Sequence, residues 1–153
     1  MVQRLFSSPS VRRSVASLWF AIFGLLIGML FALHGPIAWP ALCLYIILPT
    51  VSAAAAGFIW GSTVLDFSKT KAAADALLRG IGVATGAFVI FAICFATALP
   101  MLEHGWSLRQ APGLLMFSLT LGVLAVGPLL LIAGMVAGVT LYAFGRSASS
   151  QRT

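Results

Sequence analysis

Residues 80–99 read GIGVATGAFVIFAICFATAL, twenty consecutive positions without a charged side chain. A helix needs about 20 apolar residues to cross the roughly 30 Å hydrocarbon core of a bilayer, so this stretch predicts a transmembrane helix. A membrane β-strand would instead alternate apolar and polar residues over about 10 positions, and the apolar run at residues 88–93 does not alternate. The stretch therefore favours an all-α integral membrane protein.

Three further apolar stretches of transmembrane length lie at residues 14–33, 41–65 and 114–144. Hydrophobic residues make up 61% of the 153-residue chain and charged residues 8%, whereas about a quarter of a typical soluble domain is charged. We therefore predict a bundle of four transmembrane helices. Residues 14–144 form the single membrane domain, and two short tails, residues 1–13 and 145–153, flank it.

The basic residues are distributed unevenly between the two sides of the predicted bundle. Eight of the nine Lys and Arg lie in the tails or in the loop at residues 66–79, and the other two loops hold only Arg109. Cytoplasmic segments of membrane proteins carry this excess, so we expect both termini in the cytoplasm, as an even number of crossings also requires. The net charge of +6 is scattered and forms no dense patch for a phosphate backbone, which argues against a nucleic-acid partner.

The composition also bears on the kind of membrane. Arginine outnumbers lysine seven to two and asparagine is absent, a bias typical of GC-rich bacterial genomes. We therefore expect a multi-pass protein of the bacterial cytoplasmic (inner) membrane. The first 18 residues are rich in Arg and Ser and lack acidic residues, as mitochondrial transit peptides do, so the mitochondrial inner membrane is the alternative.

A Gly-x-x-x-Gly pair occurs in each of the four apolar stretches. The pairs are Gly24/Gly28, Gly57/Gly61, Gly82/Gly86 and Gly134/Gly138. Lipid tails are as apolar as leucine, so membrane helices associate by close backbone contact over small residues. These glycines are our predicted helix-packing residues. The contact lies either within the chain's own bundle or on a face that another subunit covers.

Two prolines, Pro49 and Pro128, lie within the second and fourth stretches and predict kinks there. As one straight helix, residues 111–144 would be about 50 Å long, well over the hydrocarbon thickness. We expect a single kinked, tilted span. Two short spans are the alternative, although they would place Arg146 and Arg152 on the outer side, against the charge distribution.

The two halves of the chain resemble each other weakly. Residues 57–67 and 134–144 align with four of eleven positions identical, and a His-Gly pair follows both odd-numbered spans. Duplication of a two-helix hairpin and convergence on common membrane-helix composition both explain this. Either way the halves would be parallel repeats. The loop between them predicts a short polar helix over residues 66–79, capped by Ser68 or Thr70.

The sequence carries little that predicts chemistry. No ionisable side chain lies at mid-membrane depth, where ion-coupled transporters and proton relays need one. No nucleophile triad, carboxylate pair or phosphate loop occurs, so we expect no enzyme and no catalytic residue. His34 and His104, near the outer ends of two helices, are weak candidates for a haem b or metal site. We favour ordinary interfacial histidines as the explanation, and we expect no metal and no cofactor.

Three hypotheses follow for function. The first is a non-enzymatic subunit, scaffold or assembly factor that packs through its glycine-lined faces against other membrane subunits or copies of itself. The second is a small transporter or channel for a neutral or lipidic solute, with Pro49 and Pro128 bending two long spans around a path. The third is a membrane anchor that binds haem through two histidines. The lipid bilayer is a partner in all three.

Overall fold

The computed structural model describes residues 8–34, 39–66, 70, 72–103, 111–125 and 127–150. The helices are α2 (Pro9–His34), α3 (Trp39–Ile59), α4 (Ala73–Glu103), α5 (Ala111–Ala125) and α6 (Gly127–Ser150), with a 3-10 turn η1 (Gly61–Thr63) after α3. These described ranges contain no strand. The prediction of an all-α protein is confirmed.

Three helices are long and apolar enough to cross a membrane. They are the segments Pro9–Leu30 of α2, Ala73–Ala98 of α4 and Gly127–Ser147 of α6. Two shorter apolar segments, Ile46–Ile59 of α3 and Pro112–Leu124 of α5, complete the set found in the described residues. The chain is therefore a membrane protein by length and composition of its helices, and the number of its crossings stays a prediction.

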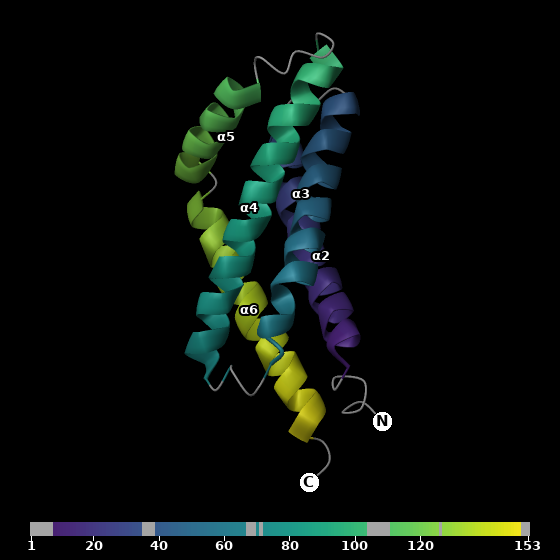
Figure 1. Cartoon of the computed structure of the whole chain (residues 1–153), viewed down its shortest axis with the longest axis vertical. Helices are drawn as coiled ribbons and strands as arrows, with labels where there is room; N and C mark the ends of the chain where they lie inside the picture. Colours follow the sequence, from purple (N-terminus) through teal and green to yellow (C-terminus); the bar gives the residue numbers. More distant parts are fainter. Residues whose placement is uncertain are drawn as a thin grey trace.

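The helices form an upright bundle (Figure 1). α2 and α3 run antiparallel and pack along each other, and α4 packs against both α3 and α6. α2 begins and α6 ends at the same end of the bundle, the lower end in Figure 1, which we call the terminal end. α3 ends and α4 begins there too, so the turn η1 also lies at the terminal end.

In the last apolar stretch, where we expected a kink, the structure describes two helices on either side of residue 126, which lies outside the described residues. One helix is described to Ala125 and the other from Gly127, with Pro128 close to its start. The chain does not reverse between them, because α5 and α6 both run toward the terminal end (Figure 1). Pro49, by contrast, lies inside the continuous helix α3.

Close glycine contacts hold the helices together near the terminal end. A Cβ on Gly80 of α4 would collide with the carbonyl oxygen of Gly134 and lie 2.9 Å from the Cα of Gly138, both on α6. In the α2–α3 pair, a Cβ on Gly57 would lie 2.8 Å from the carbonyl oxygen of Ala16. At these distances no side chain larger than hydrogen fits between the helices. Their backbones therefore make close van der Waals contacts.

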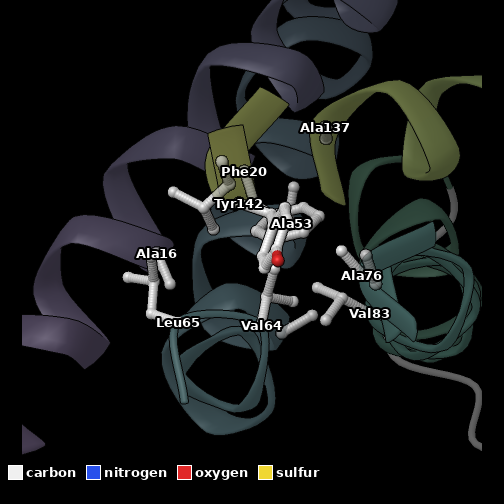
Figure 2. Close-up of a cluster of buried hydrophobic side chains, with 12 residues drawn as sticks. Ala16, Phe20, Ala53, Val64, Leu65, Ala76, Val83, Ala137 and Tyr142 are labelled. Atoms are coloured by element: carbon white, nitrogen blue, oxygen red, sulfur yellow. The ribbon is translucent and has the colours of Figure 1, made fainter. Parts of the chain in front are cut away.

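The buried core lies at the same end and draws on α2, α3, α4, α6 and the segment after η1. Its central members are Ala16, Phe20, Ala53, Val64, Leu65, Ala76, Val83, Ala137, Leu141 and Tyr142. Figure 2 shows side chains of this core converging from α2, α3, α4, α6 and the segment after η1. Because most members are small, the core is thin and the helix axes stay close.

The polar segment between α3 and α4 differs from the predicted helix. α4 begins only at Ala73, and the carboxylate of Asp75 accepts a hydrogen bond from the backbone N–H of Ala72, as in half of a capping box. Thr70 does not cap this helix: its buried hydroxyl donates to the carbonyl oxygen of Thr63, which also accepts a bond from Arg79. Ser68 lies outside the described residues.

Gly80→Leu tests the contact between α4 and α6, with Gly82→Leu as a matched control on the same helix. A side chain at Gly80 meets the backbone of α6, whereas a Cβ on Gly82 has no neighbour within 4 Å. We expect Gly80→Leu to lower the free energy of unfolding by about 1–3 kcal/mol, the usual cost of overpacking. Gly82→Leu should leave it unchanged or raise it slightly, because leucine is the better helix former. Unfolding in detergent, followed by far-UV circular dichroism, measures both; equal losses would contradict the contact.

Candidate functional site: an apolar cavity between the helices

A cavity of about 250 Å³ lies between the helices, and residues of α2, α3, α4, α5 and α6 line it. Six phenylalanines form much of its wall: Phe20, Phe23, Phe88, Phe91, Phe95 and Phe117. Between the rings, small residues leave the space open: Gly24, Ala53, Ala84, Ala87, Gly122, Ala133, Gly134 and Ala137. The cavity is thus a gap that large rings frame and small residues keep unfilled.

The cavity lies at the middle of the predicted membrane thickness. Its lining residues on α4 run from Ala84 to Phe95, around the centre of the apolar stretch at residues 80–99. On α2 they run from Phe20 to Ile27, around the centre of residues 14–33. Ligand sites in helical membrane proteins commonly lie at this depth.

Among the described residues, the lining carries no polar side chain. Besides the phenylalanines and the small residues, it consists of Ile27, Pro49 and Leu130. Burying a polar group there without a hydrogen-bond partner would cost on the order of 2–7 kcal/mol. The described lining therefore favours a nonpolar molecule.

One side of the cavity is open. α5 packs against α4 and α6, and within the described residues it contacts neither α2 nor α3. Its contact with α4 includes the ring of Phe88, whose Cζ lies 2.6 Å from the position of a Cβ on Gly122. Ile27 of α2 and Phe117 of α5 both line the cavity, and these two helices make no close backbone contact within the described residues. We call the gap between them the α2–α5 window.

Toward the terminal end the cavity is closed. Phe20, Ala53 and Ala137 both line the cavity and belong to the buried core, so the core forms its floor. Below them, Leu141 and Val83 are at most 1% exposed. Within the described residues, no open path therefore leads from the cavity to the terminal end of the bundle.

The predicted glycines fall into several environments. Gly24 lies against the carbonyl oxygen of Pro49, and Gly57 and Gly61 lie against Ala16. Gly134 and Gly138 pack on α4, Gly86 packs on the ring of Trp60, and Gly28 is buried. Gly82 is exposed, and a Cβ placed there would have no neighbour within 4 Å among the described residues.

Sequence reasoning missed Gly80, which makes the contact we expected of Gly82. Two residues correspond to about 200° around a helix, so Gly80 and Gly82 face nearly opposite directions. The spacing of Ala76, Gly80 and Ala84, small residues four apart, was the available signal.

The phenylalanines of the cavity were also missed. Phe88, Phe91 and Phe95 follow an i, i+3, i+7 pattern, which places them on one helix face, and Phe20, Phe23 and Ile27 repeat it on α2. In a chain this apolar, such a pattern does not distinguish a cavity wall from a lipid-facing or packed surface.

The structure does not test the histidine site. His34 is the last residue of α2, its side chain is outside the described set, and His104 lies beyond the described residues altogether. Among the described residues no group of three or more His, Cys, Asp or Glu stands close enough to hold a metal ion. Of the two predicted kink residues, Pro49 lines the cavity and Pro128 does not.

No protein-family model, no curated protein and no solved structure matches this chain. Its function is therefore inferred from the geometry of the cavity and of the surfaces around it.

Phe88→Ala tests whether the ring on Gly122 holds α5 in place. Without the ring, α5 keeps only its remaining contacts with α4 and its junction with α6. We expect amide hydrogen exchange in residues 111–125 to rise at least about tenfold, equivalent to roughly 1.4 kcal/mol of local stability. Exchange in α2 and α3 should stay unchanged. Val89→Ala, at the adjacent exposed position, is the control, and an equal rise there would contradict the role of Phe88.

Proposed function

We propose that this protein is a non-enzymatic, four-span protein of the bacterial inner membrane that binds a neutral or lipidic solute in the cavity between its helices. The single observation that carries the proposal is the cavity itself: about 250 Å³ between the helices, framed by six phenylalanines and bordered by the α2–α5 window. A solute that dissolves in the bilayer reaches such a site sideways without crossing a polar surface. No cofactor and no metal take part in the proposal.

The glycine contacts favour this hypothesis over a subunit held by glycine faces. Gly57, Gly61, Gly134 and Gly138 already pack against helices of the same chain. They are therefore unavailable to a partner unless the bundle opens. What they support is a bundle that is rigid at one end and keeps a cavity above that end.

A subunit or scaffold role is the second candidate, and the exposed side of α4 favours it. Gly82 and Thr85 are exposed there, flanked by the exposed side chains of Leu78 and Val89. A glycine with open space in front of it permits close approach of another membrane helix, from a different subunit or from a second copy. This face does not overlap the cavity lining, so the two roles are separable by experiment.

The topology we propose has four crossings, by α2, by α3, by α4 and by α5 with α6, and both termini in the cytoplasm. The charge distribution supports it, as does the position of the ends of α2 and α6 at one end of the bundle (Figure 1). We expect green fluorescent protein fused after residue 153 to fluoresce and alkaline phosphatase fused there to be inactive. Alkaline phosphatase fused within residues 104–110 should be active. The opposite pattern would overturn this topology.

The solute proposal is tested with Ala133→Phe, which places a phenyl ring in the cavity, and with Ala143→Phe, at an exposed position of the same helix, as a matched control. The three proteins are purified from native membranes in mild detergent, and their organic extracts are compared by mass spectrometry. We expect at least one nonpolar compound to be retained by the wild type and the control and to fall about tenfold or more in Ala133→Phe.

Identical extracts from all three proteins would contradict the solute proposal. Proteins recovered in the same samples decide on the second candidate. A membrane protein retained in stoichiometric amount by the wild type and lost in Gly82→Leu would favour the subunit role.

A further inference from the structure

The shape and the lining of the cavity narrow the class of molecule that fits it, and this inference rests on the solute-binding function proposed above. We infer that the cavity holds one linear hydrocarbon chain, lying parallel to the helices and entering from the bilayer through the α2–α5 window. The ligand is thus an acyl or isoprenoid chain, and any polar end it carries stays outside the cavity.

The first argument is the length of the cavity. Its wall on α4 extends from Ala84 to Phe95, twelve residues whose eleven rises of 1.5 Å amount to about 16 Å along the helix axis. A linear hydrocarbon chain that lies along the helices contacts the wall over this whole length.

The second argument is the chemistry of the wall. Every lining residue that the structure describes is apolar, from Phe20 at the floor to Phe95 near the upper end, so these side chains offer no hydrogen bond. A ligand with polar groups spaced along it would lose its hydration without compensation. Flat phenyl rings on α2, α4 and α5 provide dispersion contacts to a chain at any point along the slot.

The third argument is the way in. The core closes the cavity toward the terminal end, and the window between α2 and α5 opens it toward the lipid. Chains in a bilayer already run roughly parallel to transmembrane helices, so one of them enters by moving sideways with little reorientation. The window offers an apolar surface for this entry, because Phe117 lines the cavity and is also 62% exposed.

The test uses two photoactivatable probes in vesicles of palmitoyl-oleoyl phosphatidylglycerol that contain the purified full-length protein. One is a sixteen-carbon fatty acid with a diazirine in its chain, and the other is a sterol with a diazirine in its rings. After irradiation, mass spectrometry of peptides locates the adducts. We expect the fatty acid to label residues 20–27 and 84–95, and this labelling to fall at least about fivefold in Ala133→Phe and not in Ala143→Phe.

A second variant, Leu130→Trp, fills the cavity from another position, so the test does not depend on Ala133→Phe alone. Gel filtration and circular dichroism verify that both variants are folded. Adducts only at lipid-facing residues such as Leu18 and Ile132, equal in all variants, would overturn the inference and the solute-binding function together. Labelling by the sterol alone, lost in both cavity-filling variants, would overturn the linear chain and leave the solute-binding function standing.

Discussion

The close backbone contact between α4 and α6 at Gly80, Gly134 and Gly138 is the constraint on which the rest of the structure depends. Membrane helices gain little from burying apolar surface against each other, because the surrounding lipid is equally apolar. Association must come from contacts closer than lipid can make, and only glycine allows two helix backbones to approach to this degree. The contact of Gly57 and Gly61 with α2 serves the same purpose in the first hairpin. Both contacts lie toward the terminal end and fix the bundle there.

The order of residues along α4 explains why the bundle is tight at one end and open further up. Ala76, Gly80 and Ala84 come first and bring α6 close; Phe88, Phe91 and Phe95 follow on the cavity side. Rings of this size need more room than the spacing that glycine sets. Beyond them, α5 packs on α4 and α6 and, within the described residues, makes no close backbone contact with α2 or α3. The cavity is a consequence of these two features rather than a defect in packing.

Much of the fold was predictable because the membrane imposes it. Twenty apolar residues at positions 80–99 leave a helix as the only efficient solution, and three helices of spanning length confirm that argument. The details were harder. Gly82 belongs to the Gly-x-x-x-Gly motif, yet the glycine that faces α6 is Gly80. The face that a helix turns toward its neighbour depends on that neighbour and not on the motif. Pro128 was predicted to distort the helix, and the structure describes separate helices on either side of residue 126, just before this proline. The cavity was not predictable, since its walls combine side chains from five helices that are far apart in sequence.

A site made only of apolar surface has a definite consequence for selectivity. Without hydrogen-bond donors or acceptors, such a site distinguishes ligands by shape and length, and one additional methylene changes the binding free energy by only about 1–3 kcal/mol. A site of this kind therefore accepts a class of chains rather than one compound. It also competes with the bilayer itself, which is just as apolar, so net affinity must come from contacts that lipid does not make. The six phenylalanines supply these contacts, because rigid rings held by the protein lose little conformational entropy when a flexible chain settles between them.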